Sequence, residues 1–370
     1  MTEWKEYKLG EIAEITSSKR IFYSEYVSGG VPFYRSKEII DLYNKRNVAT
    51  ELYISLERYN KIKDKFGVPQ KDDILLTSVG SLGIPYKVKD EDYFYFKDGN
   101  LTWFKDININ IIYPDYFVFW LTSCIGKQKL DEITIGSTQA ALTISGLKTV
   151  VIELPPLTEQ IRIASILSSL DDKIDLLHRE NKTLEAMAET LFRQWFIEEE
   201  KEDWKEGKLG DLIEIKYGKD HKKLEDGKIP VIGSGGIMRY ANTSLYDKES
   251  VLIPRKGSLN NVMYINKPFW TVDTMFYTKM LKPNTAKFVY HFMKGLDLAN
   301  MNVGSAVPSM TTEVLNNIPI DIPPQDVFDK FENHVGNLYR KMEDNNKQIQ
   351  TLIQQRDSLL PKLMSGEVKI

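Results

Sequence analysis

Two short stretches of the sequence gather side chains that can bind phosphates or read the edges of nucleic-acid bases. Residues 219–223 read KDHKK, so four of these five positions can carry a positive charge. Arg255 and Lys256 follow the apolar run SVLIP and precede Gly257 and Ser258. Lysine and serine can hold phosphates, whereas arginine, asparagine and glutamine can pair with guanine or adenine in the major groove. These residue types predict contacts to DNA, with Arg255 and Lys256 as the strongest candidates.

Further candidates of the same kinds occur near predicted loops in both halves of the chain. In the first half they are Lys19, Arg20, Arg35, Lys37, Ser78, Ser81 and Gln139. In the second half they are Lys219, His221, Lys222, Lys223, Arg239, Arg255, Lys256, Asn260 and Asn261. The alternative for any one of them is an exposed group without a ligand, and residues 219–223 could form a solvated turn.

No catalytic motif accompanies these candidates. The sequence has no Gly-x-x-x-x-Gly-Lys-Ser/Thr loop for ATP, no Asn-Pro-Pro-aromatic motif for a methyl-accepting amine, no glycine-rich loop for S-adenosylmethionine and no His-Glu-x-x-His. The adjacent carboxylates Asp72-Asp73 and Asp171-Asp172 point apart on a strand or a helix, so we expect them to be solvated. Four scattered histidines and the lone Cys124 argue against a zinc site. We therefore expect a non-catalytic chain without a metal or cofactor of its own.

The charge of the chain is unevenly distributed. The formal net charge is −3 over 370 residues, which argues against binding DNA by charge alone. Residues 156–202 contain 11 acidic and 6 basic side chains, whereas residues 203–323 contain 13 acidic and 16 basic ones. A DNA-binding role would therefore need local basic clusters, shape complementarity and a basic partner protein.

The sequence also predicts a cytoplasmic protein. The start, MTEWKEYK, is charged and lacks the apolar core of a signal peptide. The longest apolar stretch, YFVFWL at residues 116–121, is far short of the about 20 residues that a membrane-spanning helix needs. A single cysteine fits a reducing compartment.

An internal duplication organises the chain. Residues 4–15 and 204–215 are identical at eight of twelve positions, and GSTQAALTISGL at 136–147 aligns with GSAVPSMTTEVL at 304–315. A Pro-Pro pair closes each copy, at 155–156 and at 323–324. The first copy is 32 residues longer, so the middle has changed in length between constant ends. Repeats diverge where loops carry function. We therefore expect the constant ends to form a shared scaffold and the variable middle of each copy to recognise a different target.

Each copy has the pattern of a mixed α/β domain. Short apolar runs bounded by turn residues predict strands at 12–15, 31–34, 74–77 and 93–96, with counterparts at 231–233, 251–254, 262–265 and 276–278. A predicted helix at 115–128 matches another at 284–294. We expect domains at 1–155 and 203–323, and spacer helices at 156–202 and 324–370.

A heptad pattern follows each Pro-Pro pair. The first seam consists of Leu167, Leu170, Ile174, Leu177, Asn181, Leu184, Ala188, Leu191 and Trp195. The second consists of Val335, Leu338, Met342, Asn345, Ile349, Leu352, Arg356 and Leu359. Such a narrow seam is typical of a helix that pairs with another helix. The alternative is a long helix that lies on its own domain.

Each seam contains one asparagine, Asn181 in the first and Asn345 in the second. A seam asparagine lowers stability but selects the register in which it meets a polar partner. If the two helices run antiparallel about a pseudo-twofold axis, we predict that Asn181 and Asn345 meet, with the axis between Leu177 and Asn181.

Taken in order, five motifs resemble those of the specificity subunit of type I restriction-modification enzymes. They are W-K-x-x-K-L-G-E/D (Trp4 to Glu11), GST-Q-x-x-L-T (Gly136 to Thr143), L-P-P-L-x-E-Q (Leu154 to Gln160), LFRQWF (Leu191 to Phe196) and RDSLLPKLMSGEV (Arg356 to Val368). The resemblance spans the whole chain. One departure is Val307, which stands in the second copy where the first has Gln139. Any role of Gln139 is therefore confined to one copy.

The resemblance implies two target-recognition domains joined by two long antiparallel helices. It also implies a phage-defence complex with two methyltransferase subunits and optional restriction/translocase subunits, in which partners hold S-adenosylmethionine, ATP and Mg. The target would be double-stranded DNA, asymmetric and bipartite, with one methylated adenine in each half. Two alternatives are a recognition subunit of a related type II methylase-nuclease system and a coiled-coil scaffold without DNA function. Phe192, Trp195 and Phe196 would pack in a core or, alternatively, dock a methyltransferase.

Overall fold

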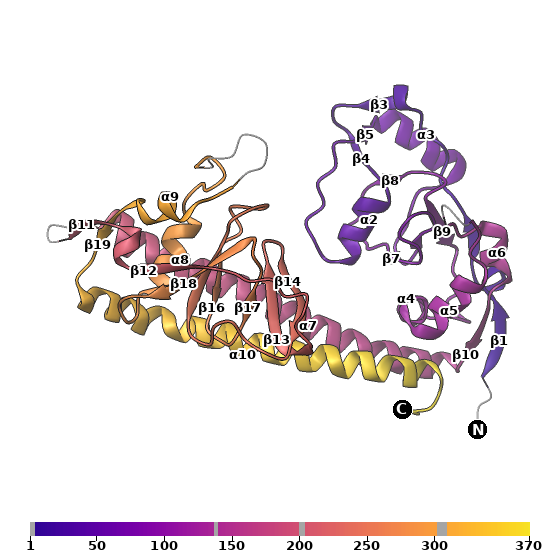
Figure 1. The fold of residues 1–370 in the computed structure, drawn as a ribbon. Helices are drawn as coiled ribbons and strands as arrows, with labels where there is room; N and C mark the ends of the chain where they lie inside the picture. Colours follow the sequence, from indigo (N-terminus) through magenta and orange to yellow (C-terminus); the bar gives the residue numbers. More distant parts are fainter. Residues whose placement is uncertain (1–3, 137–139, 200–203, 302–308) are drawn as a thin grey trace. The chain divides into compact units, whose positions relative to one another are not determined.

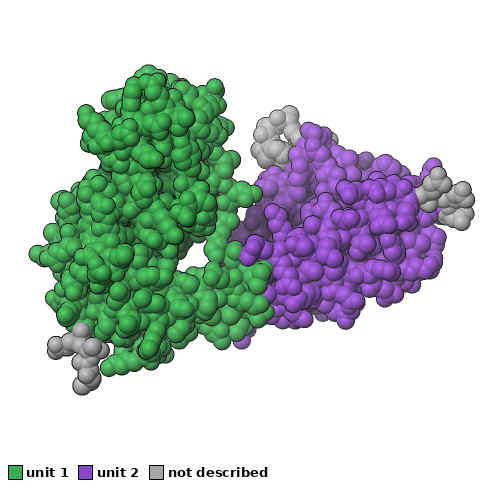
Figure 2. Space-filling model, turned by 180° about the vertical axis from the view of Figure 1, so that it is seen from behind, with its two compact units in different colours: residues 1–176, 348–370 green, residues 177–347 purple. Residues whose placement is uncertain are grey.

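The chain forms two compact units in a computed structural model that describes residues 4–136, 140–199, 204–301 and 309–370. Unit 1 comprises residues 1–176 and 348–370, and unit 2 comprises residues 177–347 (Figure 2). The division falls within the two long helices, α7 (Leu157–Arg193) and α10 (Gln325–Met364). Each unit therefore contains an α/β domain and part of both helices (Figure 1).

Unit 1 contains the strands and short helices of the first copy. The strands of unit 1 are β1 (Lys5–Lys8), β2 (Glu14–Thr16), β3 (Tyr26–Val27), β4 (Val31–Tyr34), β5 (Tyr53–Ile54), β6 (Ile74–Thr77), β7 (Pro85–Lys87), β8 (Tyr95–Phe96), β9 (Leu101–Lys105) and β10 (Val151–Leu154). Its short helices are α1 (Leu9–Ile12), η1 (Tyr23–Glu25), α2 (Ser36–Tyr43), α3 (Leu56–Phe66), α4 (Pro114–Thr122), α5 (Cys124–Glu132) and α6 (Ile144–Thr149).

Unit 2 contains the remaining strands and short helices. Its strands are β11 (Lys205–Lys208), β12 (Ile213–Tyr217), β13 (Asp226–Gly233), β14 (Gly236–Ala241), β15 (Ser250–Pro254), β16 (Met263–Ile265), β17 (Trp270–Thr271), β18 (Met275–Met280) and β19 (Pro319–Ile322). Its short helices are the π-helix η2 (Gln194–Glu198), which continues α7, and η3 (Leu209–Asp211), α8 (Ala286–Lys294) and α9 (Thr312–Asn316).

The constant ends of each copy pair with each other. β1 lies antiparallel to β10 with Lys5 opposite Leu154, and β11 lies antiparallel to β19 with Lys205 opposite Ile322. One four-stranded sheet of each unit also matches, with the orders β2-β9-β6-β7 and β12-β18-β15-β16. The duplication seen in the sequence is therefore a duplication of topology, which confirms the expected α/β fold class.

The variable middle is where the copies differ. Both contain one parallel strand pair, β4 with β8 and β13 with β17. Between β4 and β6, unit 1 inserts α2, β5 and α3, whereas unit 2 has only β14 between β13 and β15. The extra length of the first copy thus lies beside the shared sheet and leaves that sheet unchanged.

Some predicted elements need correction. The run at 12–15 divides between α1 and β2, and the helix at 115–128 is broken at Ser123, whose hydroxyl accepts a hydrogen bond from the backbone N–H of Gly126. By sheet order, β16 corresponds to β7 and β18 corresponds to β9. The apolar runs of the first copy did not predict β7 or β9. Thr102 and Lys105 interrupt the apolar pattern of β9, so its periodicity is weak.

Both long helices belong to the cores of the units. In unit 1, Leu167 of α7 packs in one cluster with Leu363 and Met364 of α10. In unit 2, the buried Phe192 and Phe196 pack with residues of α8 and α10. Core packing is therefore the correct interpretation of this aromatic group. The two interpretations of the long helices both hold. Each helix packs against the domains with one face and against the second helix with the other.

The helices pair antiparallel within each unit. In unit 1, the guanidinium of Arg356 lies 2.9 Å from the Asp171 carboxylate. In unit 2, the amide of Asn345 donates to the amide oxygen of Asn181 at 2.9 Å. Later positions of α10 thus meet earlier positions of α7, and the two asparagines meet as the heptad alignment predicts. In the part of the chain that the structure describes, no helix is long and apolar enough to span a membrane.

Candidate nucleic-acid interface

The loop after β6 in unit 1 is fixed by backbone hydrogen bonds on both sides. The N–H of Ser78 donates to the carbonyl of Asn100, and the N–H of Leu142 donates to the carbonyl of Ser78, both at 2.9 Å. Val79 forms a β-bridge with Ala141, and the following Gly80 has a φ of +80°. Glycine adopts this conformation without steric cost, so the chain can turn sharply here.

The loop after β15 in unit 2 repeats this framework. The N–H of Arg255 donates to the carbonyl of Thr274 at 2.8 Å, and the N–H of Met310 donates to the carbonyl of Arg255 at 2.9 Å. Lys256 bridges to Ser309, and Gly257 has a φ of +86°. Two loops with the same backbone therefore carry Ser-Val in one unit and Arg-Lys in the other.

Arg255 is the candidate that the structure supports best. Its side chain is half-buried, and its guanidinium carbon lies 5.4 Å from the ring centre of Tyr217. Nη1 donates to the carbonyl of Asp273 at 3.3 Å. Among the described residues, no carboxylate pairs with this guanidinium, so its positive charge is available to a ligand.

Tyr217 was not among the sequence candidates, although it ends β12 directly beside this loop. Its side chain is 52% exposed, and its ring packs edge-on against Phe276 at 5.0 Å. The available sequence signal was the offset of 200 that relates it to Ser17, which lies two residues after the strand predicted at 12–15. In unit 1, the hydroxyl of Ser17 donates to the carbonyl of Leu101 at 3.3 Å.

The basic cluster after β12 is exposed. Lys219, Lys222 and Lys223 all reach solvent, and His221 is half-buried. The loop is held by its backbone, because the N–H of Lys219 donates to Thr271 and the indole N–H of Trp270 donates to the carbonyl of Lys219. The lysine side chains are therefore free to contact phosphates from an ordered loop. Lys256, in the neighbouring loop, is exposed as well.

Three other candidates of unit 2 brace loops instead. The amide of Asn260 donates to Asp297 at 3.1 Å, and that of Asn261 donates to the carbonyl of Ser234 at 2.7 Å. Arg239 forms an ion pair with Asp226 at 2.9 Å. These donors are engaged within the protein, so they are weaker candidates for reading bases than Arg255.

The expectation that the Ser78 side chain contacts DNA is wrong. It is 2% exposed, and its hydroxyl lies 2.6 Å from that of Thr102. The side chain thus points into the sheet, because the residue after β6 continues the alternation of the strand. Its neighbour Ser81 is exposed. Gln139 lies outside the described residues.

The two candidate arginines of unit 1 are paired with carboxylates. Arg35 binds the buried Glu38 at 2.8 Å. Burial alone would raise the pKa of the Glu38 carboxyl. The hydrogen bonds from Arg35 outweigh this effect and hold that pKa below its usual value. Arg20 binds Asp98 at 2.9 Å but remains largely exposed. Arg35 therefore caps α2, while Arg20 and the exposed Lys19 and Lys37 remain candidates.

One carboxylate of the adjacent pair Asp72-Asp73 is not solvated. Asp73 is 7% exposed and accepts hydrogen bonds from the indole N–H of Trp103 and the backbone N–H of Gln70, both at 2.8 Å. Burial raises the pKa of Asp73 to about 6. The expectation for Asp73 is therefore wrong, because tertiary packing places β9 against it. Within the described ranges, no group of three or more His, Cys, Asp or Glu residues could hold a metal ion.

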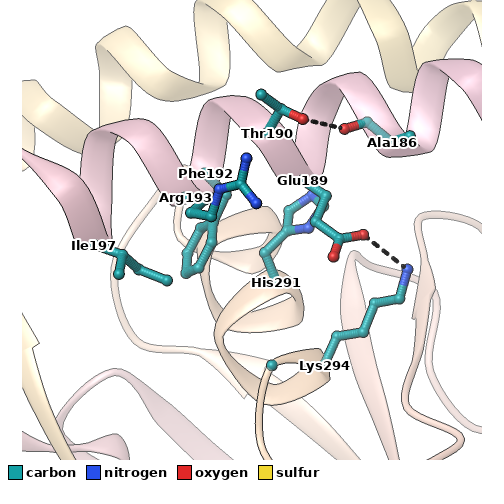
Figure 3. Close-up of a pocket in the computed structure, with 9 residues that line it drawn as sticks. Ala186, Glu189, Thr190, Phe192, Arg193, Ile197, His291 and Lys294 are labelled. Carbon is teal, nitrogen blue, oxygen red and sulfur yellow. Dashed lines mark hydrogen bonds and ion pairs between the residues drawn. The ribbon is translucent and has the colours of Figure 1, made fainter.

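A pocket of about 340 Å³ lies in unit 2 between the end of α7 and α8 (Figure 3). Arg193 and Ile197 line it from one side and His291 and Lys294 from the other. Its cations are already paired, Lys294 with Glu185 at 2.8 Å and Arg193 with Glu198 at 3.1 Å. The pocket therefore offers no free positive charge to a phosphate.

The protein consists of two α/β domains that share one loop framework but differ in its side chains, together with a pair of long helices. The model of the type I restriction modification DNA specificity domain matches residues 1–186 and 201–351, and the chain belongs to this family.

Relatives with this description are similar over the whole length. The type I restriction enzyme MjaIX specificity subunit of Methanocaldococcus jannaschii is 26% identical, and the match covers 100% of this chain and 97% of the relative. The MjaVIII specificity subunit of the same organism is 21% identical, with 100% and 93% covered. The crystal structure of a type I restriction-modification S subunit from M. genitalium has a TM-score of 0.63 at 19% identity and covers 98% of this chain and 96% of that one. This last likeness concerns the fold.

Proposed function

We propose that this specificity subunit recognises an asymmetric, bipartite target in double-stranded DNA, with one half read by residues 1–155 and the other by residues 203–323. The observation that carries the proposal is the pair of equivalent loops after β6 and β15. Their backbones make the same hydrogen bonds, but unit 2 presents Arg255 and Lys256, whereas unit 1 has the buried Ser78 and the half-buried Val79 there. A common framework with different side chains gives the two units different surfaces at equivalent places, so they are suited to different half-sites.

The exposed lysines supply the contacts to phosphates. In unit 2 these are Lys219, Lys222, Lys223 and Lys256, and in unit 1 Lys19 and Lys37. Phosphate contacts position a protein on the duplex, and each contributes to the salt dependence of binding. The net charge of −3 makes these few lysines insufficient for tight binding. The basic surface of partner subunits would supply the rest.

The paired helices act as the spacer between the two readers. α7 has 37 residues and α10 has 40, so they measure about 55 and 60 Å at about 1.5 Å per residue. This length exceeds one turn of DNA, about 34 Å. The Asn181–Asn345 hydrogen bond selects the register of the pair and thereby the gap between the half-sites.

The chain itself is non-catalytic in this proposal and acts in the cytoplasm within a larger complex. Two methyltransferase subunits would bind S-adenosylmethionine and methylate one adenine in each half-site. Restriction/translocase subunits, where present, would supply ATP and Mg chemistry. The relatives named above as specificity subunits of type I restriction enzymes support this assignment.

Selection of duplexes from a random library by the chain assembled with its methyltransferase subunits tests the proposal. We expect two blocks of preferred bases separated by a constant number of unselected positions. Enrichment of one continuous block, or no enrichment, would contradict the proposal, and no enrichment would favour a scaffold without DNA function. Replacement of both Arg255 and Lys256 by alanine should lower affinity for the selected duplex. Chains that co-purify with the subunit would separate a type I system from a type II methylase-nuclease.

A further inference from the structure

We propose that Arg255 reads a guanine in the half-site of unit 2 and that Tyr217 is the positioning residue that holds its guanidinium. The inference rests on the proposed function and deepens it. It assigns one base and one contact to one of the two readers.

The sheet of unit 2 brings the two residues together. β12 and β15 lie on either side of β18, and both run antiparallel to it. Their carboxyl ends therefore reach the same edge of the sheet, where β12 ends at Tyr217 and β15 is followed by Arg255. The backbone of Arg255 is fixed from both sides, by its hydrogen bonds with Thr274 and Met310.

The guanidinium is held in place and still has donors to offer. It lies over the ring of Tyr217 at 5.4 Å, and that ring is itself supported by the fully buried Phe276. Nη1 donates to the carbonyl of Asp273 at 3.3 Å, while Nε and Nη2 donate to no protein acceptor in the described ranges. A guanidinium plane with two free N–H groups matches the O6 and N7 acceptors of guanine.

The other arginines among the candidates lack this combination. Arg20, Arg35 and Arg239 each form an ion pair with a carboxylate, at distances of 2.8 to 2.9 Å. Arg255 forms none within the described residues. A base contact by Arg255 therefore does not have to break an ion pair first, whereas a contact by any of the other three does.

Unit 1 has serine at both equivalent positions. Ser17 stands where unit 2 has Tyr217, and Ser78 stands where it has Arg255. Both hydroxyls are engaged inside the unit, that of Ser17 with Leu101 and that of Ser78 with Thr102. The pair of an arginine and a supporting tyrosine is thus present in unit 2. Among the described residues, it is absent from the same place in unit 1. The guanine contact should belong to one half-site only.

The test compares the methylated motif of variants in a strain that expresses the chain with its methyltransferase subunits. The variants are Arg255→Ser, Arg255→Lys, Tyr217→Ser and Tyr217→Phe. Serine already occupies both positions of the same framework in unit 1, so the serine variants are expected to fold and assemble. Arg239→Ser is the matched control, because this arginine of unit 2 is paired with Asp226.

We expect Arg255→Ser to make one guanine position of one half-site degenerate, with the other half-site and the gap unchanged. Methylation at sites with another base at that position should rise to within about 2-fold of the guanine site, from a wild-type difference of at least about 5-fold. Arg255→Lys should relax the same position, since lysine lacks the planar fork. Tyr217→Ser should partly relax the preference for guanine at this position, whereas Tyr217→Phe should keep that preference. The motif of Arg239→Ser should equal that of the wild type.

Binding of the assembled complex to duplexes with 7-deazaguanine at that position gives a second readout that does not depend on methylation. The wild type should lose at least about 5-fold in affinity when N7 is removed, whereas Arg255→Ser should bind both duplexes equally. An unchanged motif in Arg255→Ser, or equal loss on 7-deazaguanine in wild type and variant, overturns the inference while the proposed function stands. A wild type without a bipartite motif overturns the proposed function itself.

Discussion

The side-chain amide of Asn345 donates a hydrogen bond to the amide oxygen of Asn181 at 2.9 Å, within the helix pair of unit 2. Asn345 is only 1% exposed and donates a second hydrogen bond to Glu180 at 3.1 Å. Asn181 in turn donates to Asn346 at 2.9 Å. A shift by one heptad would place the buried amide of Asn345 against an apolar seam residue, so these polar contacts favour one register.

Replacement of Asn181 by leucine should destabilise unit 2 by about 1–3 kcal/mol, because the buried Asn345 loses a hydrogen-bond partner. The double variant Asn181→Leu/Asn345→Leu should recover most of this loss, since both polar groups are then absent. Urea unfolding of the wild type, both single variants and the double variant measures the coupling. A double variant that loses the sum of the two single effects would contradict the proposed pairing.

Lys287 should be a strong determinant of the stability of unit 2. Its side chain is 7% exposed, and its ammonium lies 2.9 Å from Glu249 and 2.7 Å from Glu332. Lys287→Met should cost about 3–5 kcal/mol, because it leaves these two carboxylates without their cation. Lys330→Met is the matched control, since the exposed Lys330–Asp326 pair should contribute less than about 1 kcal/mol. Equal unfolding midpoints in urea for the two variants would contradict this account.

His291 should make unit 2 less stable in acid. Burial lowers the pKa of His291 to about 4, and its Nε2 lies 2.9 Å from the hydroxyl of Tyr339. Between pH 4 and the unfolded pKa of about 6.5, the unfolded chain binds a proton that the folded chain excludes. Stability should therefore fall by about 3 kcal/mol as the pH drops through this window. Urea unfolding at pH 7.0 and 4.5 should show a smaller difference for His291→Gln than for the wild type.

Asp73 should have the opposite effect in unit 1. Its folded pKa of about 6 lies above the usual aspartate value of 3.8. The folded chain thus retains a proton that the unfolded chain has released, and this stabilisation is lost as the pH rises from about 4 to about 6. The loss should be about 3 kcal/mol. Asp73→Asn should remove this dependence, and a variant with an unchanged pH profile of urea unfolding would show that Asp73 is ionised in the folded chain.

The parts of the fold that repeat or follow a period could be predicted from the sequence. The pairing of the helices follows from the heptads, because a seam determines which residues face the partner helix. The antiparallel direction was implied by the family resemblance, and given that direction the heptads predict that Asn181 and Asn345 meet. The motif Leu154–Gln160 also has a structural explanation. The buried Gln160 amide accepts from the backbone N–H of Tyr113 and donates to the carbonyls of Ile111 and Pro155, all at 2.9 Å, and so joins the start of α7 to the segment before α4 within unit 1.

The candidate interface was predictable only in part. Arg255, Lys256 and the cluster at 219–223 could be chosen from residue type and strand position. The burial of Ser78, the ion pairs of Arg35 and Arg239 and the contact between Tyr217 and Arg255 depend on side chains that meet across the sheet or from adjacent strands and turns. Local sequence patterns do not report such tertiary contacts, so they overestimated the number of free donors.

Methylome sequencing of a strain that carries this subunit and its methyltransferase tests the central claim most directly, because it reads the target of both units at once. The account predicts one motif with two different half-sites, a gap of constant length and one methylated adenine in each half. A palindromic motif, or a single continuous one, would contradict the account of two unlike readers joined by a helical spacer.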